Sequence, residues 1–229
     1  MKHTNLIRKT LTAAAATAGL LTASAMPAFA GVPLLSNGGF EAPIVSGAVA
    51  FSTGSAVGTC ANGAPYLGPD FNCWSVRGMV TLIHNDYAIN GVKVKPAAGA
   101  QFLELAGDTT SSATGGSIHV AGGVVQTVKA TPNTTPTLIV KYATMPFVGA
   151  ASTIKLTVTT CTSAGLACVQ VASASLPSVS TGNPAIMGWK TYRVLVPVNV
   201  DMGLVRVQVE KSAQQTSVGD PVVDAFSLS

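Results

Sequence analysis

The sequence has little charge, few aromatic side chains and no long helical pattern. Only 10% of its 229 residues are charged and 6% are aromatic, whereas 48% are hydrophobic. A disordered chain needs low hydrophobicity and high charge, so that class is excluded. A coiled coil needs abundant Ala, Glu, Lys, Leu and Arg, so that class is excluded as well. After residue 30, Gly, Pro and Thr interrupt every apolar run, and we expect few helices.

The excess of positive charge lies at the N-terminus. Three basic residues precede an uncharged stretch from Leu11 to Ala25, and Ala28-Phe29-Ala30 supplies the small residues of a cleavage site. This pattern predicts a secretory signal peptide over residues 1–30 and a secreted protein, either extracellular or associated with the cell wall. Without those three, the 13 basic residues become 10 against nine acidic ones, and the formal charge falls from +4 to +1. No basic cluster remains, so we expect no nucleic-acid partner. No second apolar stretch is long enough to span a membrane.

The four cysteines all follow residue 30, which suits an oxidising destination. Cys161 and Cys168 bracket a short loop between two alternating segments, as in a hairpin with a disulfide across its loop. Cys60 and Cys73 bracket a loop rich in turn-forming residues. We therefore predict the pairs Cys60–Cys73 and Cys161–Cys168. A zinc site is the alternative, but close Cys-x-x-Cys pairs are missing.

Strand patterns run through most of the chain after residue 78. In Leu204–Glu210, three valines alternate with Arg206, Gln208 and Glu210, which is typical of a half-buried strand. The other expected strands are Met79–His84, Gln101–Ala106, Ser117–Lys129, Thr137–Thr144, Thr153–Thr160, Val169–Ala174, Trp189–Val200 and Pro221–Leu228, with the alternating strand itself extending to Lys211. Many short strands separated by turns predict one all-β domain over residues 31–229, an antiparallel β-sandwich or jelly roll. Residues 46–72 are rich in Gly, Ser and Ala, and we expect a long loop there.

Two motifs at the ends of this domain carry a family resemblance. Ser36-Asn-Gly-Gly-Phe-Glu-Ala-Pro43 opens it, and Gly219-Asp-Pro-Val-Val-Asp-Ala-Phe-Ser-Leu228 closes it. Between them lie Cys73-Trp74, Gln101-Phe-Leu-Glu-Leu-Ala-Gly107, Val125-Gln-Thr-Val128 and Gly188-Trp189. This order resembles the secreted cell-wall proteins and carbohydrate-binding modules with the galactose-binding-domain-like fold. The resemblance implies a jelly roll, an extracellular role and glycan binding without catalysis. The chain departs from the pattern at Asp220, at Ala225 and in its longer loop.

The carboxylates of these two motifs are candidate metal ligands. In an extended strand Asp224 shares a face with Val222 and Phe226, where a carboxylate is costly unless it is paired or hydrogen-bonded. The resemblance implies a structural Ca²⁺ near the first and last strands, held by Glu41 and Asp224. Hard carboxylate oxygens suit that ion, although it needs about 6–8 of them. The alternative is that Asp224 accepts hydrogen bonds from backbone N–H groups.

Candidate sugar-binding residues cluster around the first disulfide loop. Tyr66 lies in that loop and Trp74 directly follows it, Arg77 is able to bond hydroxyls, and Tyr87 follows a polar turn. We predict these four as ligand-binding residues. For Trp74, and equally for Trp189, packing in the core is the alternative, because tryptophan is highly buried on average.

Sequence motifs of catalysis are missing. The chain has no HExxH and no GxSxG motif, and only Glu104 and Asp108 suggest a glycosidase pair. We therefore predict a secreted, monomeric, non-enzymatic module that binds a neutral polysaccharide or cell-wall glycan. The alternatives are a structural or protein-interaction module of the cell surface and, third, a polysaccharide hydrolase.

Overall fold

The computed structural model describes residues 34–52, 56–57, 74–110, 117–146, 151–212 and 219–229. The chain divides into two units, residues 1–30 and 31–229, and all of the described residues belong to the second. Every regular element described is a β-strand. None of these residues belongs to a helix that is long and apolar enough to cross a membrane. Secretion and cleavage after residue 30 stay predictions.

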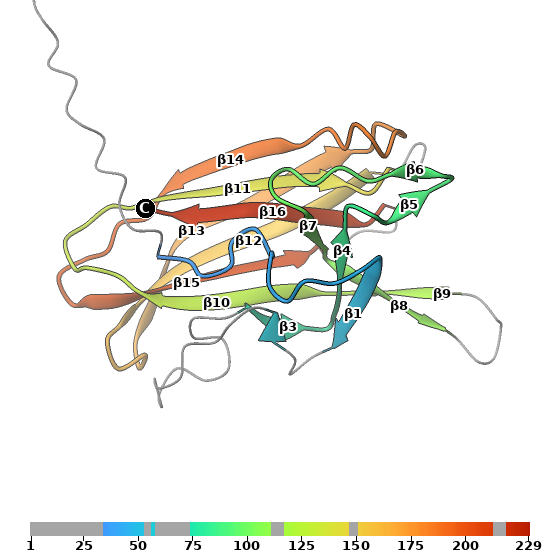
Figure 1. The fold of residues 1–229 in the computed structure, drawn as a ribbon. Helices are drawn as coiled ribbons and strands as arrows, with labels where there is room; N and C mark the ends of the chain where they lie inside the picture. The colour runs from blue at the N-terminus through green and yellow to red at the C-terminus, as the bar shows by residue number, and fades with distance from the viewer. Residues whose placement is uncertain (1–33, 53–55, 58–73, 111–116, 147–150, 213–218) are drawn as a thin grey trace, which may run out of the picture. The chain divides into compact units, whose positions relative to one another are not determined.

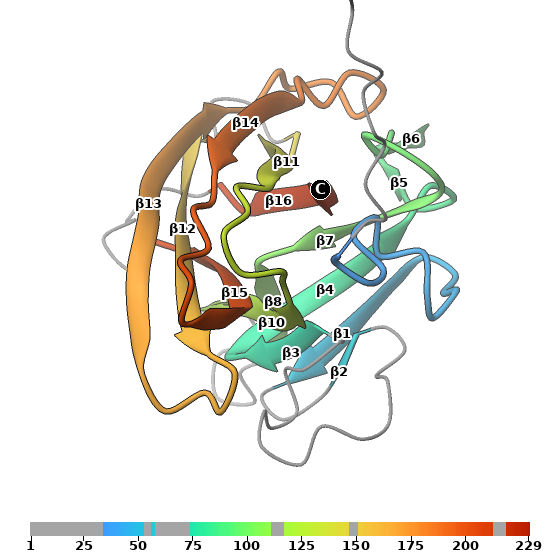
Figure 2. The same ribbon diagram turned by 90° about the vertical axis from the view of Figure 1, so that its left-hand side faces the viewer.

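Two antiparallel sheets of six strands each form the domain, as Figures 1 and 2 show. Sheet A has the order β1-β4-β7-β16-β11-β14, and its strands are β1 (Ala48–Ser52), β4 (Met79–His84), β7 (Gln101–Glu104), β16 (Pro221–Leu228), β11 (Thr137–Thr144) and β14 (Lys190–Leu195). Sheet B has the order β13-β12-β15-β10-β3-β2, and its strands are β13 (Cys168–Val179), β12 (Ala151–Thr162), β15 (Met202–Lys211), β10 (Gly123–Lys129), β3 (Trp74–Arg77) and β2 (Ala56–Val57). Two small hairpins pair β5 (Ala88–Ile89) with β6 (Val92–Lys93) and β8 (Ala106–Thr110) with β9 (Ser117–Ala121). The predicted all-β antiparallel sandwich is confirmed.

The main core lies between the two sheets. Sheet A contributes Leu82, Leu103, Val140 and Val223 among others, and sheet B contributes a row of alternating side chains such as Leu156, Val207 and Val209. The predicted alternation in β15 is confirmed, because its valines are fully buried while Arg206, Gln208 and Glu210 are half-buried on the other face. Burial of apolar area on this scale, at roughly 25 cal/mol per Å², drives the sheets together.

A second apolar cluster covers part of the outer face of sheet A. Ile83, Phe102, Ala143 and Val222 supply the sheet side, and Val94, Met145 and Met187 come from the segments beyond the strand ends. The partly buried side chains of Tyr87, Ile89 and Trp189 pack against this cluster. The segment between β13 and β14 and the β5–β6 hairpin are therefore fixed to the sheet, and they shape its outer surface.

One predicted disulfide is present. Cys161 and Cys168 are bonded across the end of the β12–β13 hairpin, with their Cα atoms 4.1 Å apart. This pair confirms the hairpin and removes both thiols from any zinc site. The predicted pair Cys60–Cys73 lies outside the described residues.

Two expectations about loops and strands need correction. Residues 48–52 were expected in a long loop, but they form β1, which pairs along its whole length with β4. The single strand expected over residues 117–129 is broken at Gly122 into β9 and β10.

The departure from the family pattern at Asp220 also has a structural reason. Its Oδ1 atom lies 2.7 Å from Lys211 Nζ, and this nearly buried ion pair joins β15 of sheet B to the start of β16 in sheet A.

Candidate functional site

The carboxylates of the opening and closing motifs meet at one loop, residues 95–101. Asp224 Oδ2 accepts hydrogen bonds from the backbone N–H groups of Ala97 and Ala98, at 2.8 and 2.9 Å. Glu41 accepts from the N–H groups of Ala100 and Gln101, at 3.0–3.1 Å. The loop therefore has its backbone donors satisfied by two side chains that are far away in sequence. Of the alternatives for Asp224, the structure shows the one in which it accepts from backbone N–H groups.

Gly99 lets this loop approach Glu41 closely. Its φ is +61°, in the left-handed region that favours glycine, and a Cβ atom built there would lie 2.2 Å from Glu41 Oε1. Any larger residue would push the carboxylate away from the Ala100 and Gln101 N–H groups.

The environment of Asp224 disfavours its charged form. Burial raises the pKa of this carboxyl to about 7, and the charge of Glu41 adds to that effect, although the N–H bonds from Ala97, Ala98 and Ala225 act in the opposite direction. The side chain is fully buried. Asp224 therefore keeps its proton to a higher pH than an ordinary aspartate does.

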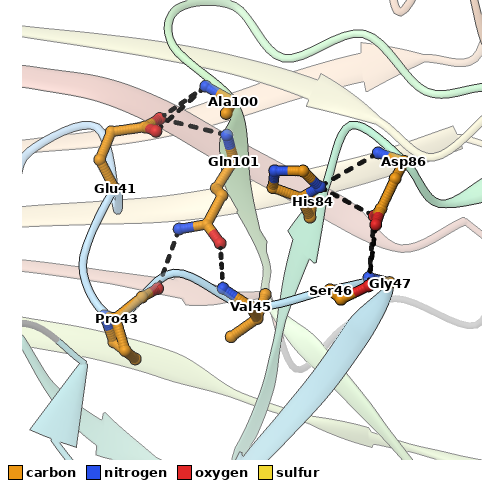
Figure 3. A network of polar contacts seen from close by, with 9 residues as sticks. All are labelled: Glu41, Pro43, Val45, Ser46, Gly47, His84, Asp86, Ala100 and Gln101. Atoms are coloured by element: carbon orange, nitrogen blue, oxygen red, sulfur yellow. Dashed lines mark hydrogen bonds and ion pairs between the residues drawn. The ribbon is translucent and has the colours of Figure 1, made fainter.

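The opening segment is anchored by further polar contacts, which Figure 3 shows together. The Gln101 amide donates to the carbonyls of Phe40 and Pro43 and accepts from the N–H of Val45. Because Gln101 also donates its own N–H to Glu41, one residue ties loop 95–101 to the segment that carries Glu41.

An exposed carboxylate next to this segment holds the start of β1. Asp86 accepts from Ser46 Oγ and from the N–H of Gly47, both at 2.8 Å, and its Oδ1 lies 2.8 Å from His84 Nδ1. These contacts, the Gly47 N–H first, lower the pKa of Asp86 to about 2. The Asp86 backbone N–H also lies 3.3 Å from His84 Nδ1.

Loop 95–101 forms one wall of a groove on the outer side of sheet A. A hollow of about 360 Å³ is lined by Lys95, Pro96, Lys141, Ile186, Met187 and Trp189, among others. A second hollow of about 410 Å³ is lined by Asn85, Lys93, Val94, Lys95, Pro96 and Gly99. Because both hollows share Lys95 and Pro96, they adjoin, and we refer to them together as the Trp189 groove.

The Trp189 ring is fixed on both its apolar and its polar side. Its indole Nε1–H donates to the Lys95 carbonyl at 2.9 Å. Its ring meets Phe102 edge to face, with centroids 5.7 Å apart and an interplanar angle of 78°. The side chain is only half-buried, so part of a rigid aromatic surface lies open in the groove.

The chain on the N-terminal side of Trp189 is folded by its own side chains. Asn183 accepts from the N–H of Ala185 through its side chain and from that of Ile186 through its carbonyl, and Thr181 Oγ1 donates to the Ile186 carbonyl. Gly188 has a φ of +68°, and a Cβ atom there would lie 2.8 Å from Thr181 Cγ2. Local bonding and one glycine thus set the direction in which Trp189 leaves this turn.

Trp74 is not a ligand-binding residue, contrary to the prediction from the sequence. It is fully buried. Its ring packs against Phe40 at 5.5 Å and Phe226 at 4.9 Å, and its indole N–H donates to the Asn37 carbonyl at 3.2 Å. Because Phe40 belongs to the opening motif and Phe226 to the closing one, Trp74 fills the core between the two ends of the domain.

Two of the other predicted ligand residues, Arg77 and Tyr87, do not converge in the structure. Tyr66 lies outside the described residues. Arg77 is exposed on β3 of sheet B, where it borders hollows on the outer face of that sheet. Tyr87 is half-buried and packs on the second apolar cluster, as Trp189 does. Of the three that the structure describes, Tyr87 alone is on the side of the molecule where the Trp189 groove lies.

The two predicted metal ligands fit calcium in charge but supply few oxygens. The Gly39 Cβ position is 3.9 Å from both Asp224 Oδ1 and Glu41 Oε1, so the carboxylates flank the same glycine. The described residues contain no cluster of three or more Asp, Glu, His or Cys side chains for a metal. Backbone N–H groups already donate to Asp224 Oδ2 and to both Glu41 oxygens. Calcium at Glu41 and Asp224 stays a prediction.

That prediction has a direct test. If Ca²⁺ binds, it neutralises two neighbouring carboxylates and raises the melting temperature of the protein, and Asp224→Ala removes the rise. Melting curves in 1 mM CaCl₂ and in chelator, for both proteins, measure this. Identical curves for the unmodified protein under both conditions would show that the N–H groups alone stabilise these carboxylates.

No known protein-family model and no curated protein sequence matches the chain. Among solved structures, it is similar to a family 61 carbohydrate-binding module in complex with β-1,4-galactotriose, with 16% identity and a TM-score of 0.45, covering 86% of this chain and 98% of that one. It is also similar to the CBM22-1 xylan-binding domain of Paenibacillus barcinonensis Xyn10C, with 16% identity and a TM-score of 0.41, covering 68% and 83%. A third similar structure is the enzymatically active domain of tailspike protein 4 of bacteriophage CBA120. Its sequence identity is 15% and its TM-score is 0.44, and the match covers 86% of this chain but 21% of that one.

The residues that line the groove were mostly missed in the sequence. Lys95, Lys141 and Ile186 carry no motif, and they meet because loop 95–101, β11 and the turn before β14 converge in space. The sequence does mark Trp189, because Gly188-Trp189 is one of the motifs on which the family resemblance rests. For Trp189 the alternative to ligand binding was packing in the core. The structure shows features of both, because the ring packs against Phe102 and is also partly exposed in the groove.

Proposed function

We propose that this protein binds carbohydrate without catalysis, at the Trp189 groove. The observation that carries the proposal is an indole ring held half-open in a hollow, with its N–H already bonded to Lys95. Sugars present C–H faces that pack on aromatic rings and hydroxyls that bond polar side chains. The groove offers both kinds of contact, through Trp189 and through Lys95, Lys141 and Asn85.

Preorganisation supports this function. The wall at loop 95–101 is fixed by Glu41 and Asp224, and the Trp189 ring is fixed by Phe102 and Lys95. A site whose side chains are immobilised before binding loses less entropy when the ligand arrives. Weak contacts with a sugar then yield a useful affinity.

The groove's side chains are suited to recognition and not to hydrolysis. They are lysines, an asparagine amide, an indole and apolar groups. Glu104, considered above for a glycosidase, lies on β7 opposite Thr81 and Val222. With the predicted signal peptide, these groups lead us to propose an extracellular polysaccharide, in the medium or in the cell wall, as the ligand.

The test is a binding measurement on Trp189→Ala. We expect affinity electrophoresis against a panel of soluble plant, bacterial and fungal polysaccharides to show retardation that this variant reduces about tenfold or more, which corresponds to about 1.4 kcal/mol of lost contact. Trp189→Phe retains an aromatic face and should keep part of the binding. Tyr192→Phe is the matched control, because Tyr192 lies on β14, packs against the main core and lines neither hollow.

Two outcomes would contradict the proposal. The first is undiminished binding by a folded Trp189→Ala, which would place the sugar elsewhere. The second is an absence of retardation by every polysaccharide, which would favour the structural or protein-interaction module. Circular dichroism of each variant shows that the fold is intact.

A further inference from the structure

Three lysine ammonium groups border the Trp189 groove. Lys93 is the last residue of β6, Lys95 lies just after the β5–β6 hairpin, and Lys141 comes from β11. Among the described residues that line either hollow, none is an aspartate or a glutamate. The groove is therefore positively charged, although the domain after residue 30 has a formal charge of only +1.

These lysines have no anionic partner within the described part of the chain. Elsewhere, Lys155 pairs with Glu210 and Lys211 with Asp220. No ion pair of this kind involves Lys93, Lys95 or Lys141 among the described residues. Lysines left unpaired around a hollow keep their full attraction for an incoming anion.

The neighbouring carboxylates accept hydrogen bonds from backbone and hydroxyl donors, and none of them forms an ion pair with these lysines within the described part of the chain. Asp224 is opposite Lys141 in the register of β11 and β16, but it is fully buried and turned toward the N–H groups of Ala97 and Ala98. Glu41 is bound to Ala100 and Gln101, and Asp86 to Ser46 and Gly47.

We propose that the ligand of this groove is an acidic glycan, in which a uronic acid carboxylate bonds Lys95 and Lys141 while a sugar ring packs on Trp189. This inference rests on the proposed function and narrows it. It departs from the neutral glycan expected from the sequence, because that expectation came from the overall charge and not from the local one. Charge-assisted bonds between an ammonium and a carboxylate are about twice as strong as neutral ones, so the acid group selects the ligand.

The experiment compares acidic oligosaccharides with their own methyl esters. Oligogalacturonate, oligoglucuronate and oligomannuronate are titrated into the full protein by calorimetry, and each is then titrated as the ester, which has the same backbone without the charge. We expect at least one acid to bind about tenfold more tightly than its ester. Raising NaCl from 0.05 to 0.5 M should weaken binding of the acid severalfold and leave the ester unchanged.

Variants separate this inference from the proposed function. Lys95→Gln and Lys141→Gln are each expected to reduce affinity for the acid about fivefold and to leave affinity for the ester unchanged, whereas Lys129→Gln, an exposed lysine on β10, changes neither. Equal affinity for acid and ester, lost in Trp189→Ala, overturns the inference but keeps the proposed function. Binding of the acid that survives Trp189→Ala places it on another surface and overturns the inference. Failure of every acid, ester and neutral polysaccharide contradicts the proposed function itself.

Discussion

Trp74→Ala is expected to lower the free energy of unfolding by about 3–5 kcal/mol, the usual cost of truncating a fully buried aromatic side chain. The ring fills the space between Phe40 and Phe226, and its loss would leave a cavity where the two ends of the domain meet. The buried Asn37 carbonyl would lose its indole donor as well. Urea unfolding monitored by circular dichroism measures the change.

The control for Trp74→Ala is Arg77→Ala, three residues along. Arg77 is exposed, so its removal should change stability by no more than about 0.5 kcal/mol. A small cost for Trp74→Ala would mean that the ring is not packed as described. Any loss of glycan binding in a folded Trp74→Ala, at full stability, would restore the ligand role given to it from the sequence.

Asp224→Ala is expected to have the second large effect, on both stability and binding. It leaves the partly buried N–H groups of Ala97, Ala98 and Ala225 without their acceptor, and each lost hydrogen bond costs about 0.5–1.5 kcal/mol. Loop 95–101 also loses one of its two anchors, so the wall that carries Lys95 is no longer fixed. We expect a lower melting temperature, together with weaker binding to any glycan that the unmodified protein retains.

Asp224 also predicts a dependence of stability on pH. Its pKa in the folded protein is about 7, against an ordinary value of 3.8, so the folded state binds the proton more tightly than the unfolded state between these values. Stability therefore falls as pH rises from about 4 to 7, by roughly 2–4 kcal/mol in chelator, and levels off above 7. The pKa of Asp86 is lowered to about 2, so its charged form stabilises the fold above about pH 4. That stabilisation is lost only as pH falls below about 4, outside the range in which Asp224 titrates.

Asp224→Asn isolates this effect, because asparagine does not titrate. Urea unfolding of the variant between pH 4 and 8 should show a flatter profile than that of the unmodified protein. Equal slopes for the two proteins would show that another group titrates, or that the Asp224 carboxyl is charged throughout.

Periodicity and turn chemistry predicted the architecture well. Met79–His84, Thr137–Thr144 and Pro221–Leu228 begin and end where the pattern placed them. The missed strands, such as β5 and β6, have two residues each and lack the length over which alternation becomes visible. β1 was missed because Ala48–Ser52 is largely exposed and lies in a stretch rich in small residues.

The site was predicted less well, for a physical reason. Glu41 and Asp224 were predicted as metal ligands because the motifs at both ends mark them, and that role stays a prediction. Their partners are backbone N–H groups of residues 97, 98, 100 and 101, whose side chains contribute nothing to those bonds. Trp74 and Trp189 both follow short motifs, and no local pattern separates the buried ring from the half-open one. Only the packing of distant segments does so.

The position of β16 has a consequence for how this domain assembles. Sheet A contains β16 between β7 and β11, so before these last described residues are in place, β1-β4-β7 and β11-β14 are two separate ribbons. The same strand supplies Asp224 to the loop that walls the groove. Closure of the sheet and completion of the binding surface are thus one event, delayed until the C-terminal segment inserts. Carbohydrate binding should then appear with the slowest folding phase and be missing from any earlier intermediate.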